Sequence, residues 1–445
     1  MPQIFDADAS PEKKLFISLI TRDISLSDAI IDLLDNSVNA AMRPIKNSFS
    51  SANDFHKLFV KASVQPEVTV RVTFDRDQVT VVDDAAGIDF DSAYHEVFRF
   101  GHSEVHDAPR DRLSVYGIGM KRALFKIGRQ ISITSNHKSG GFGLTLNVRR
   151  WAKDTALPWT IPIAKRDPAV KTGTTISISD LNPEIRERLS EKTFEHNLIE
   201  KLSKVYSFFI GRIVNIYINA KLVPRTEFDI GEDNLSHDRF KRDGVDCSIL
   251  AGIASPTSGR FESAAAGWFV FCNYRTVLYG DKSPLTGWGG ALPLFQPKHR
   301  PFLGIVLFTA ADPEALPWTT TKGYINEDNR AWQEAKLKMA AAAKPVISFL
   351  DKRYTNDGTE ILPSGIAKLA GEGVNVFEAA VAAKSTFVAP VAKKKKASTT
   401  KKVQYDAEES ELNKIRKYFG RSNMSASEIG RVTFDHFLRK VVVER

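Results

Sequence analysis

Apolar positions along the chain change their spacing from segment to segment, and the changes predict a mixture of helices and strands. Residues 11–42 contain DAIIDLLDNSVNAAM, whose apolar positions recur at i, i+3 and i+4. We expect a helix with one buried face there, with Ser27 as its N-cap. The segments 67–74 and 78–82 alternate apolar and polar residues, which predicts two strands joined by a hairpin turn.

More strands are predicted at 131–135, 142–148 and 173–181, and YGIGMKRALFKIG reads as a Gly-rich turn that opens a helix. This mixed order predicts an α/β (α+β) fold, a sheet with helices packed on one face.

A second group of elements begins near Pro183. KLSKVYSFFIGR predicts a helix, IVNIYINAKLV a strand pair that turns at Asn219, and GWFVFCNYRTVLY and FLGIVLFTA further strands. A long helix interrupted by Pro345 follows, and SELNKIRKYFGRSNMSASEIGRVTFDHFLRK shows two helical patterns. We therefore predict four regions: an N-terminal domain at 1–183, a second domain at 184–354, a flexible basic linker at 355–404 and a helical element for dimerisation or docking at 405–445.

Composition excludes several classes of protein. The 445 residues are 42% hydrophobic and 26% charged, which is typical of a soluble globular chain and excludes disorder throughout, a coiled-coil rod and a small disulfide scaffold. The two cysteines, Cys247 and Cys272, are not in a CxxC motif, so we expect buried thiols in a reducing compartment. Neither a signal peptide nor a membrane span is expected, which favours the cytoplasm.

The charge is concentrated near the C-terminus. The formal net charge is +9, of which residues 351–445 carry 18 − 12 = +6. Lys393–Lys396, Lys401 and Lys402 form a cationic cluster that could bind the phosphates of double-stranded DNA. A solubilising linker is the alternative interpretation.

Four short motifs carry candidate chemistry, and each is weak alone. Asp32 and Asn36 are four residues apart on one helical face and could orient water and complete a Mg²⁺ shell. Asp83 and Asp84 follow a strand, and one of these carboxylates could accept a hydrogen bond from an exocyclic amine. The turn from Gly117 to Lys121 could bring backbone amides to a phosphate, and Thr174 lies in a motif, KTGTT, that opens a strand. Polar turns and an ordinary strand entry are the alternative interpretations.

Taken together and in this order, the motifs resemble the GHKL ATPase superfamily, which includes gyrase, MutL, Hsp-type chaperones, histidine kinases and MORC proteins. DLLDNSVNA resembles the family's first motif, DDAAGI its DNGxGM motif, SVYGIG its lid motif, and FGHSE a lid segment of MORC-like members. The resemblance implies a Bergerat ATP-binding sandwich, the cofactors ATP and Mg²⁺, and Asp32 in the place of the catalytic Glu. It implies that Asn36 binds Mg²⁺ and that these residues bind nucleotide: Asn36, Asp83, Gly87, Ser103, Gly117, Gly119, Met120, Lys121 and Thr174.

The resemblance continues beyond this domain. PWTTTKGYIN places Lys322 before a long helix, like the Lys of the S5-like transducer domain in gyrase, MutL and MORC proteins, which reaches the γ-phosphate. A solvated surface lysine is the alternative. The nearest members are MORC-like or MutL-like, which implies an ATP-dependent homodimer that acts on DNA or a protein client.

The chain departs from the family pattern at four positions. Asp32 replaces Glu, and a displacement of about 1 Å in a reacting group can cost about 100-fold in rate, so we expect slow hydrolysis. Ala85, Asp84 and Ser114 also differ from the motifs. A catalytically inactive nucleotide-binding module is therefore the second hypothesis. A histidine-kinase-like phosphotransferase is the third, and it is disfavoured because no His precedes His56.

Overall fold

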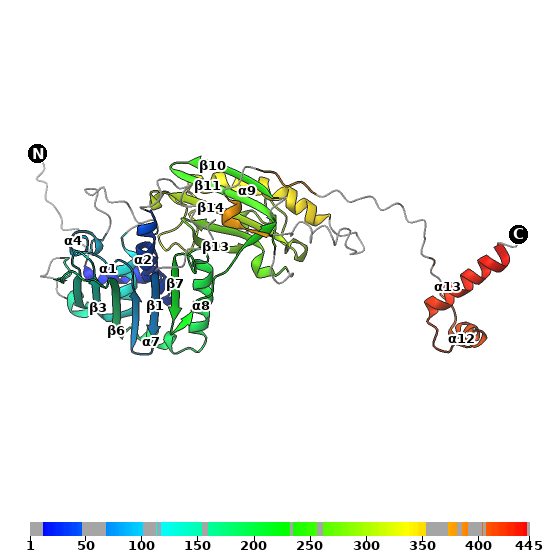
Figure 1. Cartoon of the computed structure of the whole chain (residues 1–445), viewed down its shortest axis with the longest axis horizontal. Helices are drawn as coiled ribbons and strands as arrows, with labels where there is room; N and C mark the ends of the chain where they lie inside the picture. The colour runs from blue at the N-terminus through cyan, green and yellow to red at the C-terminus, as the bar shows by residue number, and fades with distance from the viewer. Residues whose placement is uncertain are drawn as a thin grey trace, which may run out of the picture. The chain divides into compact units, whose positions relative to one another are not determined.

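The alternating segments near the N-terminus join in a mixed eight-stranded sheet within the described part of the chain (Figure 1). Antiparallel pairs dominate, and β7 (Val214–Ile218) lies parallel to β1 (Val68–Phe74). The strand order is β5 (Ala164–Lys165), β4 (Phe142–Asn147), β3 (Gly128–Asn136), β6 (Gly173–Leu181), β2 (Gln78–Asp83), β1, β7 and β8 (Lys221–Leu222).

The structure is a computed structural model that describes residues 12–46 (side chains to Arg43), 68–100, 113, 117–153, 159–231, 235–255, 261–352, 373–380, 385–389, 403 and 406–442. The chain divides into two units, Met1–Pro390 and Val391–Arg445. No described helix is long and apolar enough to cross a lipid bilayer. The mixed α/β class predicted from the sequence is confirmed.

The predicted N-terminal helix is in fact two helices, α1 (Lys13–Thr21) and α2 (Leu26–Lys46). Ser25, not Ser27, is the cap of α2, because its hydroxyl accepts a hydrogen bond from the Asp28 amide at 3.1 Å. The buried face is confirmed, with Ile30, Leu34 and Val38 fully shielded from solvent. Each such side chain contributes about 1.5–3 kcal/mol of hydrophobic free energy.

Helix α5 (Gly119–Ile127) packs against α2, and both contact the sheet. The remaining helices of this region are short: α4 (Phe90–Ser92), a π-helical turn (Ala93–Val97), α6 (Val148–Lys153) and α7 (Pro183–Leu189). Helix α8 (Phe194–Val205) ends earlier than KLSKVYSFFIGR predicts, because residues 206–209 form turns whose rings enter the core.

A second, five-stranded sheet follows in the described residues, with α9 (Arg330–Asp351) packed on it (Figure 1). The continuous apolar run of β14 is buried at every position, as expected for a central strand. Pro345 lies inside α9 without ending it. The strand order is β10 (Ser236–Arg242), β11 (Val245–Ile253), β14 (Phe302–Ala310), β12 (Gly267–Cys272) and β13 (Arg275–Asp281).

The predicted linker contains folded residues at 373–380 and 385–389. Its β15 (Gly373–Asn375) pairs with β9 (Asp229–Gly231), and α11 (Val376–Ala379) follows. Phe377 is 3% exposed because its ring packs against those of Phe208 and Phe271. Apolar burial therefore holds these residues, which we call the strap, against the second sheet.

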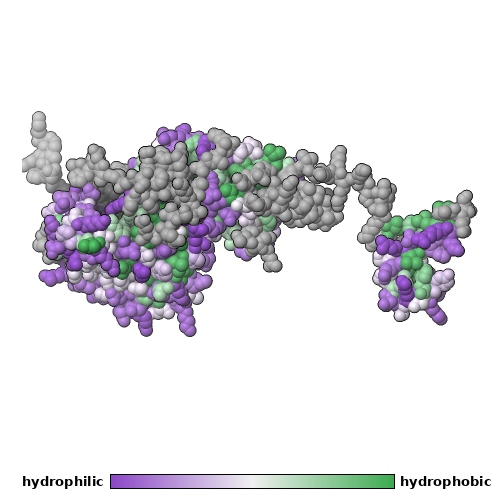
Figure 2. All heavy atoms as spheres, in the orientation of Figure 1, coloured by the Kyte–Doolittle hydropathy of each residue, from purple (hydrophilic) through white to green (hydrophobic). Residues whose placement is uncertain are grey.

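The C-terminal unit contains the two predicted helices, α12 (Glu409–Tyr418) and α13 (Ala426–Phe437), with a π-helical turn at Leu438–Val442. Figure 2 shows apolar side chains at the surface of this unit. Among its aromatic residues, Tyr418 is 79% exposed and Phe434 is 55% exposed. The lysine cluster at 393–402 lies outside the described residues.

Candidate functional site

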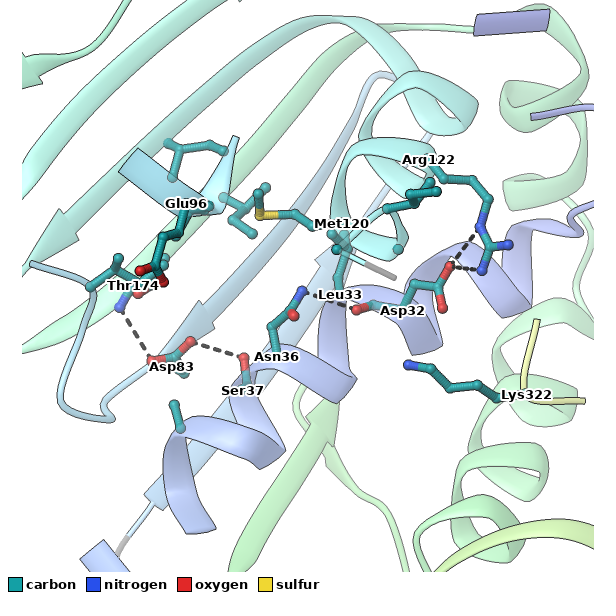
Figure 3. A pocket seen from close by; sticks show the side chains of 18 of the residues that line it. Asp32, Leu33, Asn36, Ser37, Asp83, Glu96, Met120, Arg122, Thr174 and Lys322 are labelled. Atoms are coloured by element: carbon teal, nitrogen blue, oxygen red, sulfur yellow. Dashed lines mark hydrogen bonds and ion pairs between the residues drawn. The ribbon is translucent and has the colours of Figure 1, made fainter. Parts of the chain in front are cut away.

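A cavity of about 520 Å³ lies between α2, α5 and the first sheet, with one wall from the 320–322 turn. Figure 3 shows Asp83 and Thr174 at one end of it and Asp32, Arg122 and Lys322 at the other. Residues from distant parts of the sequence meet there. The predicted site residues that line it are Asp32, Asn36, Asp83, Gly87, Gly117, Gly119, Met120, Thr174 and Lys322.

Asp83 lies at the end of β2, directly opposite Thr174 on β6. Its carboxylate accepts hydrogen bonds from the Ser37 hydroxyl at 2.9 Å and from the Thr174 amide at 3.3 Å. Burial raises the pKa of Asp83, although these donors stabilise its charged form. The result is a fixed hydrogen-bond acceptor that faces the cavity and is suited to a donor such as an amine.

The loop after Asp83 requires glycine at position 87. Its φ is +72°, and an added Cβ would lie 2.0 Å from the carbonyl oxygen of Asn136. Ser135 supports the same loop, because its hydroxyl accepts from the Ile88 amide at 2.7 Å and lies 3.2 Å from the Thr174 hydroxyl. The loop is thus shaped by close backbone packing on β3.

The N-terminus of α5 opens on the cavity. Gly117, Gly119 and Met120 line it, and Ile118 at the N-cap makes no side-chain cap hydrogen bond. The first amides of a helix have no partner within the helix and carry its positive dipole end, so this terminus is suited to an anion.

Lys121 is not among the residues that line the cavity. Its amine donates to the carbonyl oxygens of Val97 at 2.8 Å and Arg99 at 2.6 Å, beneath the π-helical turn. Burial lowers the pKa of Lys121 to about 7. Its contacts are those of a residue that anchors the segment after α4, and they do not bring it to the nucleotide-binding residues predicted beside it.

Asn36 and Asp32 share one face of α2. Asn36 is exposed to the cavity, and its amide nitrogen donates to the Asp32 carbonyl at 3.1 Å, which leaves the amide oxygen for a ligand. In the described residues no group of three His, Cys, Asp or Glu side chains is placed to hold a metal. The Asn36 amide oxygen is the kind of oxygen ligand that Mg²⁺ takes, together with phosphate oxygens and water.

Asp32 has a partner that the sequence did not reveal. The Arg122 guanidinium on α5 donates from Nε at 3.0 Å, and the carboxylate is 4% exposed. Burial raises the pKa of Asp32, more than Lys322 and Arg122 lower it. Asp32 is therefore a buried carboxylate at the edge of the cavity, held in place by an ion pair.

Lys322 pairs with Asp35, which lies about one helical turn after Asp32 on α2. Its ammonium lies 2.7 Å from the Asp35 carboxylate, which also accepts from Arg275 at 3.1 Å and from the Tyr206 hydroxyl at 2.7 Å. Burial alone would raise the pKa of Asp35, but Arg275 and Lys322 outweigh it and hold that pKa below its ordinary value.

The charges at this end of the cavity do not balance. Two buried carboxylates, Asp32 and Asp35, meet three buried cations, Arg122, Arg275 and Lys322. With all five groups ionised, one positive charge is left over beside the cavity. A buried surplus charge is costly unless it is neutralised, so this end of the site favours an anionic ligand.

Residues 24–172 are similar to the histidine kinase-, DNA gyrase B- and HSP90-like ATPases. The matched segment contains α2, Asp83 and its loop, and the N-terminus of α5, and it ends two residues before Thr174. It supports the GHKL superfamily, and hence ATP binding, for this part of the chain. No curated protein matched the chain in a sequence comparison.

Tyr206 and Arg275 lie outside residues 24–172, and no sequence motif indicates that they contribute to the site. Arg122 has a weak sequence signal for the site, because it lies three residues after Gly119 and therefore near the same helical face. Ser37 follows Asn36 directly on the helix, and nothing in its position along the sequence indicates its hydrogen bond to Asp83. Ser103, predicted to bind nucleotide, lies outside the described residues.

Proposed function

We propose that the first unit is an ATP-binding switch that hydrolyses ATP slowly with Mg²⁺. The observation that carries the proposal is the convergence on one cavity of Asp83, the N-terminus of α5 and Lys322, from three separate parts of the chain. An adenine acceptor, a phosphate-binding helix end and a cation are thereby arranged along a single cleft (Figure 3).

The proposal assigns a role to each of these residues. Asp83 accepts the exocyclic amine of adenine, with Thr174 beside it. The amides at Gly119 and Met120 bind phosphate oxygens. Lys322 neutralises charge on the terminal phosphate, and Asp32 orients the attacking water and takes its proton. Bound Mg²⁺, with Asn36 as a ligand, supplies electrophilic stabilisation of phosphate charge.

The second sheet and α9 act in this proposal as an S5-like transducer, because Lys322 links them to α2. We infer MORC-like or MutL-like behaviour: ATP-dependent homodimerisation, with DNA or a protein client as the target, in the cytoplasm. The basic region before α12 is the candidate DNA contact. The exposed apolar side chains of α12 and α13 favour a dimerisation or docking role for the C-terminal unit.

The decisive experiment is steady-state ATP turnover with Mg²⁺, with and without double-stranded DNA, at two salt concentrations. Turnover should be slow, lost in Asp32→Asn, and reduced in Lys322→Ala. Stimulation by DNA that disappears at high salt supports the nucleic-acid target. Wild-type protein that binds no ATP would overturn the proposal.

A catalytically inactive nucleotide-binding module is the second candidate, and one observation favours it. Asp32 is buried and already paired with Arg122, so water must displace or share that contact to be activated. ATP binding with turnover equal to that of Asp32→Asn would select this candidate.

A further inference from the structure

The network around Asp35 joins α2 to three later points of the chain, two of which, Arg275 and Lys322, belong to the second sheet and the turn before α9. Tyr206 follows α8, Arg275 begins β13, and Lys322 lies in the turn before α9. Their side chains and that of Asp35 are all buried. The network is therefore a direct contact between the helix that carries Asp32 and Asn36 and the region proposed as the transducer.

The donors divide unequally between the two oxygens of Asp35. Oδ1 accepts from both Tyr206 and Arg275, whereas Oδ2 accepts from Lys322. If the ammonium leaves Oδ2, the carboxylate still keeps one cation and one hydroxyl donor. An unpaired buried carboxylate would be strongly destabilising, and these two donors prevent that state.

The main chain of Lys322 is fixed independently of its ammonium. Arg275 Nη1 donates to the Lys322 carbonyl at 2.6 Å, and the Lys322 amide donates to Thr319 at 2.8 Å. The residue has a φ of +55°, which few side chains adopt without support. A held backbone with a long flexible side chain allows the ammonium to turn between Asp35 and the cavity, which Lys322 also lines.

We propose that Asp35 is a positioning residue that holds the Lys322 ammonium in reserve, and that Arg275 and Tyr206 allow Asp35 to release it to the terminal phosphate of a nucleoside triphosphate. This inference rests on the proposed function, since it takes nucleotide binding in the cavity as given. The exchange conserves ion pairing, because the phosphate replaces Asp35 as the counter-ion of Lys322. A diphosphate lacks the third phosphoryl group that would take the place of Asp35 beside Lys322, so the network discriminates between the two nucleotides.

The test is the ratio of two affinities, for ADP and for a non-hydrolysable ATP analogue with Mg²⁺, measured by calorimetry on the full chain. In Asp35→Asn the hold on Lys322 is weakened, and the preference for the analogue should rise by about 10-fold. In Arg275→Gln, Lys322 becomes the only cation of this network left on Asp35, and the preference should fall by about 10-fold.

Opposite changes in this preference in Asp35→Asn and Arg275→Gln distinguish positioning from simple damage to the fold, because damage would change the preference in the same direction in both variants. Asp35→Asn leaves two buried cations and could fail to fold, so Tyr206→Phe provides an independent arm. Its hydroxyl bonds to Asp35 and to the Ile31 carbonyl. The preference for the analogue should fall in this variant also, by less than in Arg275→Gln.

Lys322→Gln should lose the preference for the analogue while keeping its affinity for ADP. An unchanged or increased preference in both Arg275→Gln and Tyr206→Phe would overturn the inference, as would a decrease in a folded Asp35→Asn. Wild-type protein that binds neither nucleotide would instead overturn the proposed function. The two failures are therefore distinguishable.

Discussion

The Arg122 guanidinium on α5 donates from Nε to the Asp32 carboxylate on α2 at 3.0 Å, and both side chains are buried. The residue expected to activate water is thus already half of an ion pair. Because α5 begins at the glycine turn that opens on the cavity, this pair also ties the proposed phosphate-binding helix to the proposed base.

Replacing Arg122 by Gln should shift the acid limb of the pH–rate profile of ATP turnover to higher pH. Burial raises the pKa of Asp32, and Arg122 is one of two cations that oppose this rise. Without the guanidinium the carboxylate stays protonated to higher pH and is a poorer base at a given pH. Arg129→Gln is the matched control, since Arg129 pairs at 3.7 Å with a partly exposed Asp180. A limb at the wild-type position in Arg122→Gln would contradict this prediction.

Asp35→Asn should lower the free energy of unfolding at pH 7 by about 3–5 kcal/mol, because it leaves two buried cations without their carboxylate. The pKa of Asp35 is lowered in the folded state, so its stabilising effect is complete above its ordinary value of 3.8 and is lost as the pH falls through the folded pKa. In urea unfolding, the difference in unfolding free energy between wild type and variant should therefore become smaller as the pH falls below 3.8.

Asp28→Asn is the control for this measurement on the same helix. Asp28 pairs with Lys201 at 2.6 Å, but the two side chains are 38% and 41% exposed. An exposed pair contributes about 1 kcal/mol or less. Equal losses of unfolding free energy in Asp35→Asn and Asp28→Asn would mean that burial does not determine how much the Asp35 network stabilises the fold.

Asp83→Asn should weaken binding of ADP and ATP alike by about 10- to 100-fold, since a hydrogen bond to a charged group is worth about 1.5–3 kcal/mol. Selectivity for adenine over guanine nucleotides should decline as well, because the carboxylate is the fixed acceptor for the exocyclic amine. Asp84→Asn is the matched control, because Asp84 accepts from the Thr69 amide at 2.6 Å and is not among the residues that line the cavity. Calorimetry with ADP, ATP, GDP and GTP checks both the affinity and the selectivity.

Gly87→Ala should destabilise the fold by at least about 1–3 kcal/mol, since the residue would be strained at its φ of +72° and its Cβ would meet the Asn136 carbonyl at 2.0 Å. Gly119→Ala is the comparison, because there the nearest atoms belong to Asp32 at 3.5 Å, an ordinary contact. Its stability should stay within about 1 kcal/mol of wild type. Thermal unfolding of the two variants should therefore separate clearly.

Local periodicity was enough to predict the elements that carry the site. The apolar spacing around Ile30 and Leu34 gave the buried face of α2, and alternation gave β2, which ends at Asp83. The error at the N-cap was also local. Ser25 and Ser27 are both plausible caps, and only the bond from the Asp28 amide to Ser25 decides between them.

The pairing of charges could not be predicted in the same way. Arg275 lies 240 residues from Asp35, and Arg122 lies 90 residues from Asp32. A single sequence indicates that a buried carboxylate needs a cation, but it contains no signal for which one. The strap was missed for a related reason, since its composition resembles a linker and its order comes from Phe377 entering a ring cluster built elsewhere.

That ring cluster gives the strap a mechanical consequence. Phe377 of the strap packs against Phe208, whose ring stacks on Tyr274 at 4.1 Å. Phe208 is two residues from Tyr206, and Tyr274 directly precedes Arg275. A displacement of Phe377 would therefore act on side chains next to the two donors that steady Asp35, so the packing of the strap and the state of the cavity are linked through one ring cluster.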